Sequence, residues 1–180
     1  MNSLYLKSAR LILEPLKEQH ADFLLEGLQD LELYRFIPQE PPQDDMHLRE
    51  RFMRLAKGPA PYGNEVWLNW AVREKFGDQY VGLIEATIDD NSGANKSAHL
   101  AYFIFRSFWR SGYATEACGR AIEHLIHDRD CKVIRAEVDT RNAASIALLT
   151  KLGFRRIAFN AEADVFKGSS SDEYVYELRA

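Results

Sequence analysis

Apolar and polar residues alternate in several short runs of this chain, which is the pattern of half-buried β-strands. Such runs predict strands over 66–73, 80–88, 98–105 and 133–138. Turns at Gly77-Asp78 and at 89–93 make the first three an antiparallel meander. The last run follows a helical segment, so a crossover connection makes it parallel to its neighbour. The pattern therefore predicts a mixed, mostly antiparallel sheet.

Other segments repeat apolar residues at helical spacing. Ala21, Leu24 and Leu28 predict a helix over 18–28. Further helices are predicted over 31–36, around 46–55 with an end at Gly58, after Gly112, and from Asn142 to Gly153. The serine- and glycine-rich run at 168–171 can bury almost no surface, which predicts a mobile segment over 159–172.

Length and charge narrow the class of protein. The chain has 180 residues, of which 46% are apolar, and this predicts a single domain over 1–180. Lys and Arg total 23 against 27 Asp and Glu, a net charge of −4, and no segment is strongly basic. We therefore expect no nucleic-acid partner. No apolar run approaches the roughly 20 residues that span a bilayer, so we expect no membrane partner and a cytoplasmic protein.

The two cysteines, Cys118 and Cys131, are too few for a disulfide framework and lack metal-ligand spacing. We expect each to be a small, at least partly buried thiol. No metal and no cysteine nucleophile is therefore predicted.

The most informative motif joins a strand to a helix through a turn with little side-chain bulk. The strand Leu100–Phe105 leads into Trp109-Arg110-Ser111-Gly112-Tyr113-Ala114-Thr115, and a helical pattern follows. A helix N-terminus presents about four unpaired N–H groups and a partial positive charge. Gly112 and Ala114 would let a pyrophosphate approach those donors. An ordinary strand-to-helix turn is the alternative interpretation.

A second motif lies about thirty residues downstream, where Asn142-Ala143-Ala144-Ser145 opens a helix that ends at Gly153-Phe154. Together, the two motifs resemble those of the GCN5-related N-acetyltransferases, in particular the branch that contains the ribosomal-protein N-terminal acetylases. The runs 8–16 and 172–178 resemble the opening and closing strands of that branch. In the segments from about 30 to 65 and from 159 to 171 we identify no motif of the family.

The resemblance implies an α/β fold with a mostly antiparallel central sheet of about seven strands and helices on both faces. It implies acetyl-CoA as cofactor, with the pantetheine arm between the strands 100–105 and 133–138 and the pyrophosphate on the amides of 110–114. The expected cofactor-binding residues are Phe103, Ile104, Phe105, Trp109, Arg110, Ser111, Gly112, Tyr113, Ala114, Thr115, Asn142 and Ser145. Trp109 is expected to anchor the turn against the sheet.

Acetyl transfer to an amine requires a proton acceptor for the amine and a proton donor for the leaving thiolate. Many family members place a Tyr donor where this chain has Leu149, so the resemblance shifts this role to Ser145, with water as the alternative. Alternation places Glu85 on the face of Val81 and Leu83, where an apolar setting would raise its pKa; it is the predicted base. A solvent-facing glutamate is the alternative.

Other residues keep two interpretations. Tyr102 and His99 either relay a proton or only pack. Asn142 either binds the cofactor arm through its carboxamide or caps the helix that follows. Glu137 is interpreted as an exposed or paired charge and Glu116 as a structural carboxylate at a helix start.

The acceptor remains open in the sequence. The resemblance favours a protein or peptide N-terminal amine, and a polyamine, an amino sugar or an amino acid are alternatives. A non-catalytic acyl-CoA sensor is a further alternative, and the chain is expected to be a monomer or a homodimer. A Rossmann dehydrogenase would need more glycines than the turn at Gly112 supplies.

Overall fold

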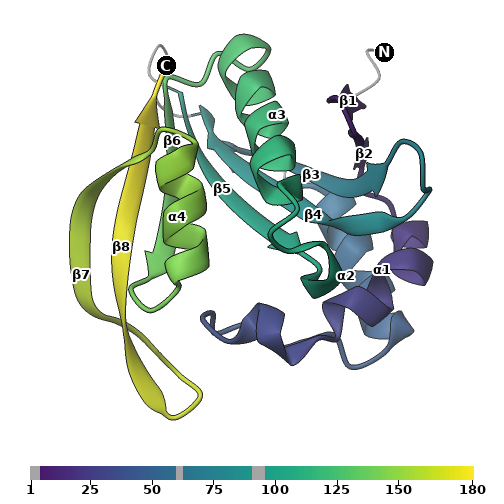
Figure 1. Ribbon diagram of the computed structural model, residues 1–180, viewed down its shortest axis with the longest axis horizontal. Coiled ribbons are helices and arrows are strands. Elements are labelled where there is room, and N and C mark those ends of the chain that lie inside the picture. Colours follow the sequence, from purple (N-terminus) through teal and green to yellow (C-terminus); the bar gives the residue numbers. More distant parts are fainter. Residues whose placement is uncertain (1–4, 60–62, 91–95) are drawn as a thin grey trace.

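The computed structural model describes residues 5–59, 63–90 and 96–180, and these form one continuous sheet with helices on both faces (Figure 1). The strands are β1 (Leu6–Lys7), β2 (Leu11–Pro15), β3 (Glu65–Glu74), β4 (Tyr80–Asp89), β5 (Ser97–Ile104), β6 (Val133–Asp139), β7 (Arg155–Phe166) and β8 (Ser169–Arg179). Their order across the sheet is β1-β2-β3-β4-β5-β6-β8-β7. Among the described strands only β5 and β6 pair in parallel, which confirms the mixed, mostly antiparallel sheet.

The described sheet has eight strands instead of the expected seven or so, and one of them, β1, precedes the predicted opening run 8–16. Leu6 pairs with Leu13, and a short connection through Ser8 and Arg10 reverses the chain between β1 and β2. The expected turn at Gly77-Asp78 lies between β3 and β4, where Asp78 has a φ of 52°. The turn expected at 89–93 falls largely on residues 91–95, outside the described residues.

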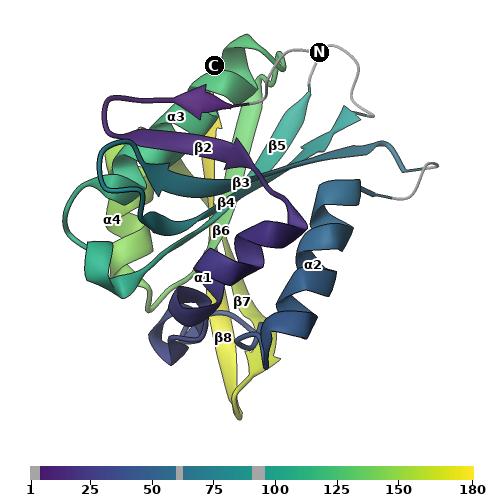
Figure 2. The same ribbon diagram turned by 90° about the vertical axis from the view of Figure 1, so that its right-hand side faces the viewer.

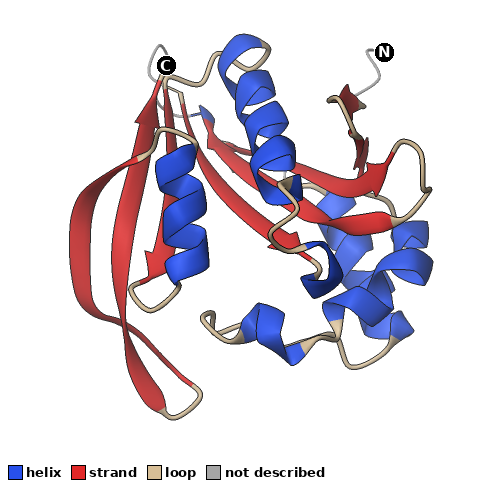
Figure 3. Cartoon of the chain, in the orientation of Figure 1, coloured by secondary structure: helices blue, strands red, loops and turns tan. Residues whose placement is uncertain are grey.

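The expectation of a mobile segment over 159–172 is wrong, because these residues belong to the long hairpin β7–β8 (Figure 3). The hairpin turns at Lys167 and Gly168, both with positive φ, and has two register shifts. Antiparallel pairing is made by the backbone and needs no apolar side chains. Low apolar content therefore did not prevent this segment from forming strands.

The helices are divided between the two faces of the sheet (Figure 2). On one face lie α1 (Ala21–Leu28) and α2 (Asp45–Lys57), which ends at Gly58 as expected; on the other lie α3 (Tyr113–His127) and α4 (Ala143–Lys151). Short 3-10 turns occur at η1 (Glu18–His20), η2 (Leu31–Tyr34) and η4 (Arg106–Phe108). Each face therefore has its own apolar core, one under α3 and α4 and one under α1 and α2.

The parallel pairing of β5 with β6 covers three register pairs and ends at His99 and Arg135. Beyond that point the two strands separate, which Figure 1 shows clearly. Strand β6 continues to pair with β8, and β5 continues to pair with β4. The sheet therefore has an opening between β5 and β6, and the expected site lies there.

None of the described helices is long and apolar enough to cross a membrane. Within the same residues no group of three or more His, Cys, Asp and Glu side chains is placed to hold a metal ion.

Candidate active site

The edge of β5 that borders the opening carries backbone groups without a strand partner. Phe105 N–H donates to Val81 O at 2.9 Å, so alternation directs the amides of Phe103 and Phe105 toward β4. The amides of Leu100 and Tyr102 then face the opening. This edge can pair with an extended amide-containing arm or stabilise an oxyanion.

The helix α3 begins at the mouth of this opening with its first-turn amides uncapped. Gly112 is its N-cap residue in the left-handed conformation, with a φ of 81°, and among the described residues no side chain caps this helix. Arg110 also has a positive φ, 60°. A Cβ on residue 112 would stand in front of the amides, so glycine leaves a cradle that an anionic group can enter.

Trp109 holds this turn against the sheet, as expected. Its Nε1 donates to Ile104 O at 2.6 Å, so this carbonyl of the expected cofactor edge is occupied. Ile104 and Phe103 have largely buried side chains, as has Phe105. Contacts from these three residues to a cofactor are therefore restricted mainly to the backbone.

Arg10, a residue that the motif did not identify, completes the turn from the distant connection between β1 and β2. Its Nη1 donates to Ser111 O at 3.0 Å, and its guanidinium carbon lies 4.4 Å from the centre of the Tyr113 ring. Its Nη2 is the atom that a Cβ at Gly112 would meet, at 3.3 Å. The turn thus gains a cation that no local sequence signal indicates.

Glu116 is the anchor that holds Arg10 there. Its Oε1 accepts from Ser8 Oγ at 2.7 Å and from Arg10 N–H at 2.6 Å, while Oε2 accepts from Arg10 Nε at 2.6 Å. These donors hold the pKa of Glu116 below its usual value even though burial opposes the shift. The predicted structural role of Glu116 is therefore confirmed, and its carboxylate joins the opening strands to α3.

At the start of α4, Asn142 caps the helix. Its Oδ1 accepts from Ser145 N–H at 3.1 Å, so the capping interpretation is correct. Only the oxygen is used in this bond, and the amide NH₂ can still donate to a ligand. Asn142 and Ser145 are thereby fixed relative to each other at the edge of the opening.

The structure brings Ser145 and Tyr102 together, two of the predicted catalytic residues. Burial raises the pKa of Tyr102, and the Ser145 hydroxyl offsets this shift only in part, so the phenol stays protonated at neutral pH. Leu149, at the position where the resemblance implies a tyrosine in many family members, is buried in the core under α4. Ser145 and Tyr102 therefore form the hydroxyl pair on the α4 side of the opening.

The predicted apolar setting of Glu85 is wrong. Arg51 of α2 donates from Nη2 to Glu85 Oε1 at 3.0 Å, and both side chains are mostly buried. The predicted face was also partly wrong, because Val81 packs under α3 while Leu83 packs under α1 and α2. The change of face occurs at Gly82, whose φ is 152°, opposite a register shift between Val72 and Arg73. Glu85 is therefore the carboxylate of a mostly buried ion pair with Arg51.

A second charged pair borders the opening on the face covered by α1 and α2. His99 of β5 and Glu137 of β6 approach with Nδ1 3.2 Å from Oε1 and 3.3 Å from Oε2. The interaction raises the pKa of His99, although burial opposes the shift, and lowers the pKa of Glu137. The expectation that Glu137 is a paired charge is confirmed, and its partner is the histidine that sequence reasoning left unassigned.

The tip of the β7–β8 hairpin meets the segment that follows η2. Lys167 Nζ donates to Ile37 O at 3.2 Å and also to Tyr34 O. This contact links the two halves of the sheet on the α1 and α2 side. The segments 30–65 and 159–171, in which sequence reasoning identified no motif, therefore come together at this face.

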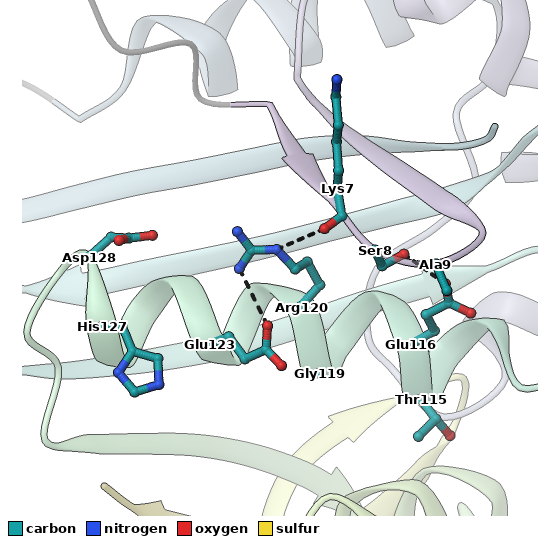
Figure 4. Close-up of a pocket in the computed structure, with 10 residues that line it drawn as sticks. All are labelled: Lys7, Ser8, Ala9, Thr115, Glu116, Gly119, Arg120, Glu123, His127 and Asp128. Carbon is teal, nitrogen blue, oxygen red and sulfur yellow. Dashed lines mark hydrogen bonds and ion pairs between the residues drawn. The ribbon is translucent and has the colours of Figure 1, made fainter.

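A groove of about 720 Å³ lies elsewhere, along the outer side of α3 beside β1 (Figure 4). It is lined by Lys7, Ser8, Ala9, Thr115, Glu116, Gly119, Arg120, Glu123, His127 and Asp128. Arg120 there pairs with Glu123, its Nη1 lying 3.6 Å from Oε2, and its Nε donates to the backbone oxygen of Lys7. The groove includes Thr115 and Glu116 from the first turn of α3 but lies outside the opening between β5 and β6.

The two cysteines contribute no nucleophile to the site. Cys118 and Cys131 are free and buried, and burial raises the pKa of both thiols. A protonated, buried thiol is unreactive at neutral pH.

Comparison with known proteins agrees with this geometry. Residues 10–155 match the family model of the acetyltransferase (GNAT) domain. The chain is 25% identical over 178 residues to the uncharacterized N-acetyltransferase p20 of Bacillus licheniformis, covering 99% of this chain and 96% of that protein. The fold and the matched region define an acyltransferase domain, and the chain belongs to the GNAT acetyltransferase family.

Solved structures share the fold across nearly the whole chain. A putative ribosomal-protein-serine acetyltransferase from Vibrio cholerae has a TM-score of 0.80 at 18% identity, with both chains fully covered. RimL, a ribosomal alpha-N-protein acetyltransferase solved in complex with coenzyme A, has a TM-score of 0.80 at 16% identity, with 97% of each chain covered. The expected family and the expected helices on both faces of a mixed sheet are therefore confirmed.

Proposed function

We propose that this protein transfers an acetyl group from acetyl-CoA to a primary amine. The observation that carries the proposal is the opening between β5 and β6, with the uncapped N-terminus of α3 at its mouth. Bound acetyl-CoA supplies a thioester carbonyl that an amine attacks, and a thiol leaves. This chain's residues must bind the cofactor, accept the amine proton and donate to the thiolate.

The donors of the site fit such a cofactor. The amides of residues 112–115 and the cation of Arg10 suit a pyrophosphate, because a helix N-terminus and a guanidinium both favour anions. The free edge of β5 and the NH₂ of Asn142 suit the amide-bearing arm. Ser145, beside a protonated Tyr102, lies on the α4 side, where it can supply a proton to the sulfur.

We infer that the amine arrives from the opposite face, over β4 and β5, where charged side chains are available. Two carboxylates on that face, Glu85 and Glu137, favour a cationic amine. A protein or peptide N-terminus is our first proposal for the acceptor, since relatives of this fold carry that activity in their names. A small-molecule amine is the alternative, and acyl-CoA sensing without turnover is the second candidate function, favoured by the buried Leu149.

The test begins with thermal unfolding in saturating acetyl-CoA, with NAD as control. A ligand at 100 times its Kd stabilises by about 2.7 kcal/mol, which raises the Tm by several degrees. A thiol-release screen then uses four probes: a peptide with a free N-terminal serine, spermidine, glucosamine and phenylalanine. Release with one probe supports the enzyme, a shift without release supports the sensor, and no shift contradicts both.

A further inference from the structure

We propose that the His99–Glu137 pair, and not Glu85, is the proton acceptor for the incoming amine. The inference rests on the proposed acetyl transfer and names the base of that same site. It stands on three observations: the position of the pair at the opening, the orientation of the imidazole, and the occupation of Glu85 by Arg51.

The first observation is position. His99 is the last residue of β5 that pairs with β6, and Glu137 lies two residues beyond its register partner Arg135. The two side chains come from the two strands that border the opening, on the face opposite α3 and α4. Glu85 lies one strand further away, on β4 beside Ala101.

The second observation is the space next to the pair. Ala101 is the next residue of β5 on this face, and it is exposed. Its methyl group leaves room for an amine directly beside the opening, between Glu85 on one side and Glu137 on the other. The His99–Glu137 pair on this face would accept a proton from the amine. Ser145 and Tyr102 on the opposite face would donate a proton to the thiolate.

The third observation is chemistry. Glu137 lies against Nδ1 of His99, which fixes the tautomer that carries a proton on Nδ1 and leaves the lone pair on Nε2. A bound ammonium gives one proton to Nε2, which leaves a neutral amine and an imidazolium stabilised by Glu137. By contrast, the Glu85 carboxylate already accepts from Arg51 at 3.0 Å, and protonating it would remove the charge that balances a mostly buried guanidinium.

The base must be neutral to work, so its titration appears in the pH dependence of the reaction. Glu137 and Arg135 of β6 and Asp89 of β4 are the charged groups that act on His99, and Glu137 dominates by raising the pKa. Activity should therefore rise through a pH above the ordinary value for histidine, which is about 6.5. Removing the charge of Glu137 should move this rise in activity to lower pH.

The test compares Glu137→Gln, His99→Gln and Glu85→Gln with the wild type. His47→Gln is the matched control, because His47 forms a similar pair with Asp44, at 2.7 Å and about half exposed, on α2. The first readout is the NMR titration of the His99 ring in the free protein, assigned from its loss in His99→Gln. The second is the pH profile of kcat/KM with the probe that gives most thiol release.

We expect the wild-type kcat/KM to follow the titration of His99, and both to shift to lower pH in Glu137→Gln. In His99→Gln the rise of kcat/KM with pH should disappear and kcat should fall about 100-fold, with unchanged affinity for acetyl-CoA. His47→Gln should match the wild type. A rise of kcat/KM with pH that survives in His99→Gln, or that disappears only in Glu85→Gln, would overturn the proposal. If no probe reacts with a wild type that binds acetyl-CoA and titrates normally at His99, the proposed transfer itself fails.

Discussion

Replacing Gly112 by alanine should weaken acetyl-CoA binding well beyond its cost to stability. The left-handed φ of 81° makes an alanine there cost about 1–2 kcal/mol. The added Cβ also stands before the amides of α3, and losing one charge-assisted hydrogen bond costs about 1.5–3 kcal/mol. We therefore expect the Kd for acetyl-CoA to rise about 10- to 100-fold.

Gly168→Ala is the matched control for backbone strain. Gly168 has a φ of 76° at the hairpin tip, and a Cβ there meets no atom within 4 Å. Both variants should lower the Tm by about 2–8 °C, since 1 kcal/mol corresponds to about 2–4 °C in a domain of this size. Calorimetric titration with acetyl-CoA then separates them. Equal, small changes of Kd in the two variants would refute the placement of the pyrophosphate at Gly112.

Three further predictions concern the β6–α4 connection. Asn142→Asp keeps the cap but loses the NH₂ donor, so it should retain stability and bind acetyl-CoA more weakly. Asn142→Ala should bind acetyl-CoA more weakly and also lose about 1 kcal/mol of stability in urea unfolding. Equal affinities of Asn142→Asp and the wild type for acetyl-CoA would remove the residue from the cofactor site. Ser145→Ala should leave the Kd for acetyl-CoA unchanged and lower kcat by about 100-fold, and a normal kcat would exclude Ser145 as the proton donor. Hydrogen bonds from Arg141 and Ser171 hold the pKa of Asp139 at about 2, below the unfolded value, so this carboxylate stabilises the fold above about pH 4 and ceases to do so as the pH falls through 2. Urea unfolding of Asp139→Asn should therefore show a deficit on the order of 2 kcal/mol at pH 5 that shrinks toward pH 2, and a deficit independent of pH would contradict the assignment.

Sequence reasoning succeeded where the signal was local. The strand, turn and helix around Gly112 lie within one short stretch, and the need for a left-handed residue before a helix is visible in the glycine itself. The cap at Asn142 was recognisable for the same reason, because residue type and position suffice to predict it.

Partners that approach from distant elements could not be predicted. Alternation placed Glu85 in a strand, but its partner Arg51 comes from a helix 34 residues away. The break of alternation at Gly82 left no clear sequence signal, and it placed Val81 and Leu83 on opposite faces. His99 was recognised as a possible proton relay and Glu137 only as an exposed or paired charge, and the register of β5 against β6 is what brings them together.

The contacts of Glu116 have a consequence for how the protein folds. Ser8 and Arg10 are 108 and 106 residues from Glu116, so their contacts at the start of α3 close one of the longest loops in the domain. Contacts of such sequence separation form late, because the entropy of loop closure must be overcome first. Refolding chains should thus acquire secondary structure before they can retain acetyl-CoA. A nascent chain that has emerged only as far as β5 lacks α3 and therefore the proposed cofactor site, and a chain without Ser8 and Arg10 lacks the contacts that Glu116 makes there.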